Sequence, residues 1–240
     1  MKKFYLLVIV FSFTVALHPL YGDDLSYTAF TLNYSYQDVH TDADYIKTVW
    51  SGEDDKLAHG FNLGIHLQQK LYKKLVLVTG VQYQFTARFK ENVSMPDVPL
   101  KGQLSGSGDI KFFNHNIIVP IKFGFSMPFG GTSSFTVYGG PSLNFNVATH
   151  QTFELNSKNY LFYDYVNGRI TEKINGSKHT DKSSDFKEMK WFDIPLGLGA
   201  VVKFGRFGLR FEYEWGLVNR MKHEGKFRSD QLTAGILISF

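Results

Sequence analysis

The sequence predicts an all-β protein, an eight-stranded antiparallel up-and-down transmembrane β-barrel with long extracellular loops and short periplasmic turns. Three observations predict this fold class. Eight segments alternate large apolar residues with small or polar ones. Each segment is about as long as the 9–11 residues that a tilted strand needs to cross a bilayer. The gaps between the segments are alternately long and short, as in outer-membrane barrels.

The segment 207–217 (FGLRFEYEWGL) shows the alternation most clearly. Every second residue is large and apolar, and Arg210, Glu212 and Glu214 lie between them. A period of two gives a β-strand two different faces. A soluble sandwich would bury the aromatic face, whereas a membrane barrel turns it to lipid and lines its lumen with the charges.

The first four segments carry apolar residues on one face and small or polar residues on the other. Segment 27–36 sets Phe, Leu and Tyr against Ala, Thr, Asn and Ser, and 59–68 sets Phe, Leu and Ile against Gly, Asn, His and Gln. Segment 75–87 sets Leu, Val, Tyr and Phe against Gly, Gln and Thr. Segment 116–125 sets Ile, Val and Phe against Asn, Pro, Gly and Lys122. Each segment is therefore predicted to be a strand with one face toward lipid and the other toward the lumen.

The last four segments repeat the pattern. Segment 135–147 sets Phe, Val and Leu against Thr, Gly, Ser and Asn, and 192–204 sets Phe, Ile, Leu and Val against Asp, Pro, Gly and Lys. Segment 207–217 follows, and 232–240 sets Leu, Ala, Ile and Phe240 against Thr, Gly, Leu and Ser. Ending on an aromatic residue of the lipid face is typical of bacterial outer-membrane barrels, so Phe240 is predicted to be a recognition element for the barrel-assembly machinery.

The lengths of the connections separate the barrel from the sandwich. Short gaps lie near 69–74, 126–134 and 205–206, and long gaps lie near 37–58, 88–115, 148–190 and 219–230. A sandwich with Greek-key connections gives no reason for such regular alternation. An even number of strands in this phase predicts that both termini of the mature chain are periplasmic.

The gap 148–190 contains a further hairpin signal. Asn167-Gly168 lies between two extended runs and favours a type I′ turn. Neither face of the return arm 169–174 is free of charge, which disfavours contact with lipid. We therefore expect this hairpin to extend above the membrane, and a ten-stranded barrel is the alternative.

The N-terminus predicts a secretory signal peptide over 1–22, followed by the barrel domain over 23–240. Lys2 and Lys3 precede about 14 apolar residues, which is within the range of a signal and short for a membrane helix. An anchor helix is the alternative. Without the two lysines, the 26 basic residues fall to 24 against 22 acidic ones, a net charge of +2 that indicates no nucleic-acid partner. The chain has no cysteine, which excludes disulfides, thiol catalysis and a lipoprotein anchor.

Four of the segments together resemble a known family. "NIIVPIKFGF", "FTVYGGPSLNFNV", "FDIPLGLGAVVKF" and "GLRFEYEWGLVNR" are similar in order and spacing to successive strands of the PorT-like outer-membrane β-barrel family. The resemblance covers most of 23–240, with Glu212 where the family more often has a small or apolar residue. It implies an eight-stranded barrel in the outer membrane of a Gram-negative cell, and it implies no single activity. The predicted signal peptide adds the expectation that the chain is exported through the general secretory pathway.

The predicted lumen contains three charges of each sign. An eight-stranded barrel is only wide enough for side chains to fill it, so a balanced set indicates a paired internal network. A proton or ion path is the alternative. The predicted network consists of Lys122, Asp193, Lys203, Arg210, Glu212 and Glu214. On the opposite face, Tyr213 and Trp215 are predicted to face lipid near the outer rim, where aromatic girdles lie.

No motif in the sequence indicates catalysis, a cofactor or a metal. The histidines show no ligand spacing such as H-E-x-x-H, and no G-x-S-x-G is present. His40, Asp42 and Asp44 share an acidic loop with Asp54 and Asp55, which lacks the spacing of a calcium loop. We therefore expect a non-enzymatic barrel whose partners are outer-membrane lipid, the assembly machinery and an extracellular or envelope ligand of the loops. A small passive porin-like channel, an accessory of a protein-secretion machine and a membrane enzyme are the alternatives.

Overall fold

The computed structural model describes residues 25–41, 57–94, 107–155, 159–164, 169–174, 190–219 and 227–240. The predicted signal peptide and the acidic loop 42–56 lie outside them. The described residues contain no helix that is long and apolar enough to cross a membrane. Eleven strands are described: β1 (Tyr27–Thr41), β2 (Leu57–Tyr72), β3 (Leu75–Ser94), β4 (Ser107–Gly130), β5 (Ser133–Leu155), β6 (Asn159–Asp164), β7 (Arg169–Ile174), β8 (Phe192–Asp193), β9 (Leu196–Phe204), β10 (Phe207–Trp215) and β11 (Phe227–Ser239).

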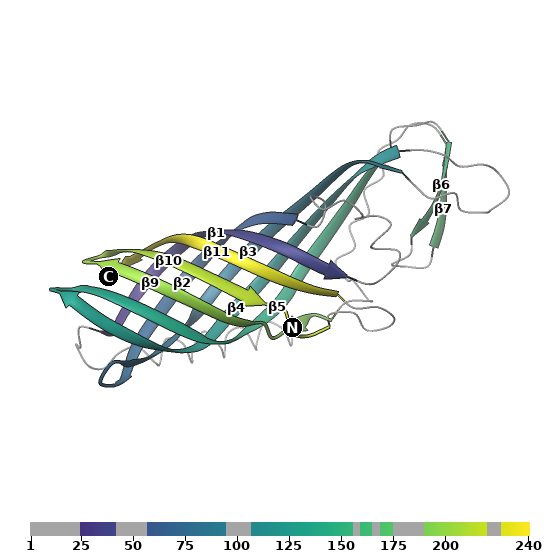
Figure 1. Ribbon diagram of the computed structural model, residues 1–240. Coiled ribbons are helices and arrows are strands. Elements are labelled where there is room, and N and C mark those ends of the chain that lie inside the picture. Colours follow the sequence, from purple (N-terminus) through teal and green to yellow (C-terminus); the bar gives the residue numbers. More distant parts are fainter. Residues whose placement is uncertain are drawn as a thin grey trace.

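Neighbouring strands pair antiparallel into a closed barrel (Figure 1). The order is β4, β3, β2, β1, β11, β10, β9 and β5, and β5 pairs again with β4. The first and last strands lie side by side, with Ala29 opposite Ser239 and Thr41 opposite Phe227. Closure leaves no unpaired edge around the ring of eight, and the predicted fold class is confirmed.

The short strand β8 continues the line of β9 along β5 and is not a ninth strand of the barrel. Both pair with β5, and Ile194 and Pro195 separate them. A proline has no N–H to give to the ladder. The register nevertheless continues, because the N–H of Ser142 donates to the Pro195 carbonyl at 2.9 Å and the N–H of Asn146 donates to the Trp191 carbonyl at 2.8 Å.

The strands β6 and β7 form a two-stranded sheet of their own and do not pair with the barrel. The ten-stranded alternative is therefore wrong. The predicted hairpin exists, with Asp164 opposite Arg169, and its Asn167-Gly168 turn lies outside the described residues. In Figure 1 this sheet lies beyond the ends of β4 and β5 that point away from the short turns.

Two-residue turns join the strands at one end of the barrel. Lys73-Lys74 joins β2 to β3, Gly131-Thr132 joins β4 to β5, and Gly205-Arg206 joins β9 to β10. Gly131 and Gly205 have φ values of +51° and +58°, the left-handed region that glycine enters at no steric cost. The start of β1 and the end of β11 lie at this same end, which we call the short-turn end, and the opposite end is the long-loop end.

Three strands are much longer than predicted. The segments 88–94, 107–115 and 148–155 were expected to belong to long loops, and each is instead the outer part of β3, β4 or β5. The ladder continues from Leu75 opposite Phe125 to Ser94 opposite Ser107. A strand beyond lipid needs no apolar face, so the alternation ends there although the backbone pairing continues. In Figure 1 these three strands extend past the others at the long-loop end.

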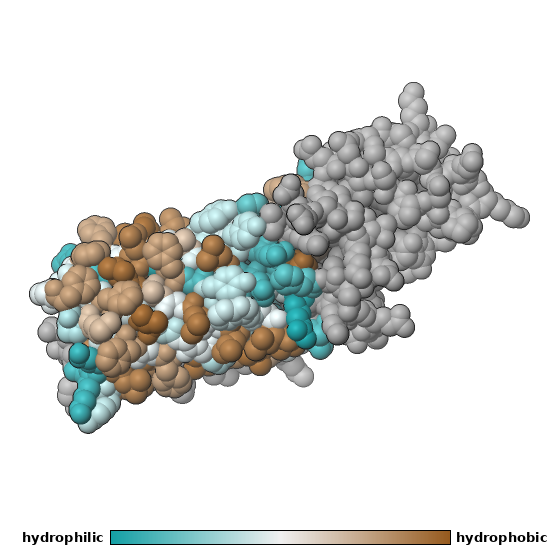
Figure 2. Space-filling model, viewed as in Figure 1, coloured by the Kyte–Doolittle hydropathy of each residue, from teal (hydrophilic) through white to brown (hydrophobic). Residues whose placement is uncertain are grey.

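The two faces of the strands are oriented as the barrel requires. Along β10 the odd-numbered residues are exposed and the even-numbered ones are buried. Large apolar side chains cover most of the visible exterior of the barrel in Figure 2, with hydrophilic residues gathered at the short-turn tip and beside the grey atoms. An apolar band between two hydrophilic zones is the surface that a bilayer matches.

The interior is polar along its length, and toward the short-turn end it also contains a cluster of apolar side chains. Seven buried side chains form this apolar cluster: Tyr27, Ala29, Val76, Val78, Tyr138, Val201 and Leu237. Periodicity places Leu237 on the same face as Thr233, and the structure shows that it fills the interior rather than contacting lipid.

Candidate functional site

The candidate site is a cluster of buried charges in the middle of the barrel. Alternation along β10 turns Arg210, Glu212 and Glu214 inward, and Lys122 extends toward them from β4. β4 and β10 are separated by β5 and β9 in the ring, so these contacts cross the interior. All four side chains are at most 5% exposed.

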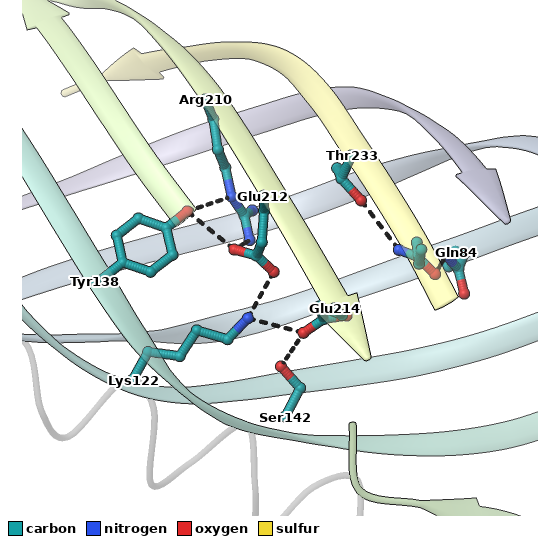
Figure 3. Close-up of polar contacts among 9 residues, drawn as sticks. Gln84, Lys122, Tyr138, Ser142, Arg210, Glu212, Glu214 and Thr233 are labelled. Atoms are coloured by element: carbon teal, nitrogen blue, oxygen red, sulfur yellow. Dashed lines mark hydrogen bonds and ion pairs between the residues drawn. The ribbon is translucent and has the colours of Figure 1, made fainter. Parts of the chain in front are cut away.

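Lys122 bridges the two carboxylates. Its Nζ donates to Oε1 of Glu212 at 2.6 Å and to Oε1 of Glu214 at 2.7 Å (Figure 3). Charge-assisted bonds of this length are the strong class. With both carboxylates ionised, the two cations and two anions of the cluster sum to zero, which is the condition under which buried charges are tolerated.

Two residues of β5 complete the cluster. Arg210 Nη2 donates to Oε2 of Glu212 at 2.7 Å, and its Nε donates to the Tyr138 hydroxyl at 3.0 Å. The same hydroxyl donates to Oε2 of Glu212 at 2.9 Å, and the Ser142 hydroxyl donates to Oε1 of Glu214 at 2.5 Å. Figure 3 shows the resulting chain of contacts from Arg210 to Ser142.

Glycines of β9 make room for the cluster. A Cβ on Gly199 would lie 2.5 Å from Cε2 of Tyr138, and one on Gly197 would lie 2.7 Å from Cγ of Glu214. Real Cβ atoms do not come this close to other atoms. The motif "LGLGAV" is therefore explained by the side chains that cross in front of it, because only glycine leaves that space.

Two of the six predicted charges, Lys203 and Asp193, make contacts outside the cluster. Lys203 is near the short turn, where its Nζ donates to the Thr132 carbonyl at 3.1 Å and lies 5.1 Å from the centre of the Tyr27 ring. Asp193, at the long-loop side of Pro195, accepts from the N–H of Ile194 at 2.8 Å. The structure thus brings Lys122, Arg210, Glu212 and Glu214 together, and Asp193 and Lys203 make these other contacts.

A second polar chain crosses the interior and was not predicted. The Gln84 amide donates to Gln231 at 2.7 Å, Gln231 donates to Thr233 at 3.0 Å, and Asn116 donates to Gln84 at 3.0 Å. It joins β11, β3 and β4, and Asn146 of β5 extends it by donating to Asn116 at 3.0 Å. The repeated Gln and Asn residues on the inward faces of the strands could have indicated which residues take part, but not which of them are hydrogen-bonded to one another.

The predicted girdle residues lie on the exterior. Tyr213 and Trp215 are 36% and 37% exposed, and their ring centres are 4.9 Å apart. The Tyr213 hydroxyl donates to Asp230 at 3.1 Å. The hydroxyl therefore has a hydrogen-bond partner where the apolar face of the strand ends, on the side of the long loops. Phe240 is 78% exposed at the short-turn end.

No group of three His, Asp or Glu side chains is placed to hold a metal ion in the part of the chain that the structure describes. Of the five residues that the sequence grouped into an acidic site, only His40, in β1, has a described side chain. Its Nε2 lies 3.2 Å from Asp230 and 3.9 Å from Asp38, at the rim between β1 and β11.

Comparison with known proteins finds similar architectures among solved structures. No family model and no curated protein matches the chain, so the resemblance to the PorT-like family stays a prediction. The attachment invasion locus protein Ail of Yersinia pestis, solved with the heparin analogue sucrose octasulfate, aligns with a TM-score of 0.43 at 14% identity, covering 90% of this chain and 99% of Ail. Neisserial surface protein A aligns with a TM-score of 0.39 at 12% identity, covering 89% and 97%.

The outer-membrane protease OmpT of Escherichia coli also aligns, with a TM-score of 0.35 at 10% identity, covering 90% of this chain and 96% of OmpT. Identities of 10–14% and TM-scores below 0.5 transfer neither a ligand nor an activity to this chain.

Proposed function

We propose that this chain is a non-enzymatic integral protein of the bacterial outer membrane, a barrel with a closed interior that binds an extracellular or envelope ligand at its long-loop end. The observation that carries the closed interior is the Lys122 bridge to Glu212 and Glu214, which crosses the lumen between β4 and β10. An apolar cluster lies below it at the short-turn end. The interior of an eight-stranded barrel is only wide enough for side chains to fill it, so such a bridge leaves no open channel beside it.

The elongated strands support binding at the long-loop end. β3, β4 and β5 continue as paired sheet beyond the level at which their apolar alternation ends. Rigid scaffolds commonly present binding residues on the segments that extend from them. The interior carboxylates support a role without catalysis, because Glu212 and Glu214 are held by Lys122 and Arg210 and so serve the packing of the barrel.

The experiment is conductance of the purified protein in planar bilayers, together with its topology in cells. We expect no steady current from the wild-type protein. A protease-cleavable tag inserted within 148–190 should be cut on intact cells, and the same tag after Phe240 should be protected. Reproducible large open-channel currents would favour a porin-like channel instead, and cleavage of the C-terminal tag would contradict the orientation.

A further inference from the structure

The interior wall opposite the charge cluster is built from three neighbouring strands, β1, β2 and β3. Its residues meet in three levels of the register, each with one residue from each strand. The levels are Thr31, Gly64 and Gln82; Asn33, Asn62 and Gln84; and Ser35, Gly60 and Thr86. We call this set the β1–β3 wall. All of its side chains are amides or hydroxyls, so the wall itself carries no charge.

The wall concentrates buried polar atoms that have no partner among the described residues. These atoms are Nδ2 and Oδ1 of Asn33, Oγ of Ser35, Oδ1 of Asn62, Nε2 of Gln82 and Oγ1 of Thr86. The residues that carry them are at most 2% exposed. Native proteins rarely leave buried polar groups without a hydrogen bond, and ordered water is the usual partner where no protein group serves.

The glycines of the wall keep it free of further side chains. A Cβ on Gly60 would lie 1.9 Å from the carbonyl oxygen of Phe85, and one on Gly64 would lie 2.2 Å from that of Val81. The backbone of β3 is therefore too close for any side chain at these two positions. Gly60 lies between Ser35 and Thr86 in the register, and it has no side chain that could cover the hydroxyl of either residue.

Each end of the wall is defined. Toward the long-loop end it continues into a cavity of about 10 Å³ that Thr86 shares with Gln37, Asn114 and the buried Arg88. This volume is close to the room that one water occupies. Toward the short-turn end it continues to His66, which is fully buried, has an unpartnered Nδ1 and lies opposite Ala29 of the apolar cluster.

We propose that the β1–β3 wall is a hydrated recess, entered from the long-loop end and closed at His66 by the apolar cluster, that binds water and uncharged hydrogen-bonding molecules of similar size. The wall offers donors and acceptors from amides and hydroxyls and no charge to compensate an ion. The paired charges of the interior lie on the other side, where they compensate one another, and the buried Arg88 lies beyond the wall, at its long-loop end. The recess thus hydrates the barrel without giving ions a way across it.

Thiol labelling of the folded protein tests the recess, since the chain has no cysteine of its own. Ser35→Cys and Thr86→Cys place a thiol on the wall, and Val78→Cys places one in the apolar cluster. The probes are the small neutral reagent methyl methanethiosulfonate and its trimethylammonium-ethyl analogue. We expect the neutral reagent to modify both wall thiols about tenfold faster than it modifies the thiol at position 78. We also expect it to react there about tenfold faster than the cationic reagent, because an uncompensated charge is costly to bury and Arg88 at the entrance repels a cation. Equal rates at all three positions, or wall thiols that react only after unfolding, would overturn the proposal.

A second variant tests hydration where labelling is hindered by space. Thr86→Val removes the hydroxyl and keeps the shape. If Oγ1 of Thr86 binds water, the variant loses that bond and its urea midpoint falls, whereas loss of a dry, unpartnered hydroxyl raises the midpoint. Thr136→Val is the matched control, because the Thr136 hydroxyl donates to Ser126 at 2.9 Å and its loss lowers the midpoint in either case. A rise for Thr86→Val beside a fall for Thr136→Val would show the wall to be dry.

Discussion

Lys122 is the cation that contacts Glu214, whose other partner is the neutral Ser142 hydroxyl. Replacing Lys122 with Met therefore leaves a buried carboxylate without a compensating charge. We expect the free energy of unfolding to fall by about 3–5 kcal/mol, the range for breaking a buried ion pair from one side. Urea titration of the folded barrel in lipid measures this. The exposed Lys74→Met is the control and should change stability by no more than about 0.5 kcal/mol.

A double-mutant cycle tests the pairing itself. Because Glu214→Gln removes the charge that Lys122→Met leaves uncompensated, the double variant should be more stable than the sum of the two single losses predicts. We expect a coupling free energy of about 0.5–3 kcal/mol. Strict additivity would mean that the two side chains do not interact in the folded protein.

Residue patterns predicted which charges face the interior but not which ones touch. Alternation along 207–217 was enough to turn Arg210, Glu212 and Glu214 inward. The partner of each charge depends on the stagger between β4 and β10, which are far apart in sequence and are not adjacent in the sheet. Tyr138 was missed for a related reason, since a tyrosine on an inward face does not show from sequence that its hydroxyl joins Arg210 to Glu212.

At the scale of the strand, the sequence of β9 is constrained by the Tyr138 and Glu214 side chains that pack against its glycines. Gly199→Ala forces a methyl group against the buried ring of Tyr138, and we expect a loss of about 1–3 kcal/mol, as for other overpacked interiors. Gly139→Ala is the matched control. Its Cβ would meet Cδ2 of Leu198 at 2.6 Å, but that side chain is 57% exposed and can move. Equal losses in the two variants would contradict the role given to Gly199.

Element boundaries were predictable only where lipid imposes a pattern. The turns at 73–74, 131–132 and 205–206 fall within the predicted short gaps. The outer parts of β3, β4 and β5 were predicted as loops, because alternation is a signal of contact with lipid and not of backbone pairing. The break between β8 and β9 arises from Pro195, which interrupts the ladder without interrupting the barrel.

At the scale of the whole molecule, the terminal residue bears on assembly. Phe240 is exposed at the end of β11, and its N–H donates to the Thr28 carbonyl at 3.1 Å. If the assembly machinery recognises this aromatic end, deleting Phe240 should leave protein in the periplasm, where it is degraded. Phe207→Ala is the control, since it removes a neighbouring exposed ring at the same end and keeps the terminus. Normal insertion of the protein without Phe240, with lowered stability alone, would reduce the residue to an anchor.

The central claim is that the aromatic face of the strands contacts lipid and the charged face lines the interior. The most direct measurement is quenching of Trp215 fluorescence by lipids brominated along their acyl chains, in a variant in which Trp50 and Trp191 are replaced by Phe so that one of the three tryptophans remains. Because Trp215 is exposed near the long-loop end of β10, we predict strong quenching, greatest when the bromine lies close to the headgroup. Fluorescence that brominated lipids leave unchanged, in a protein shown to be folded, would contradict the assignment of the two faces.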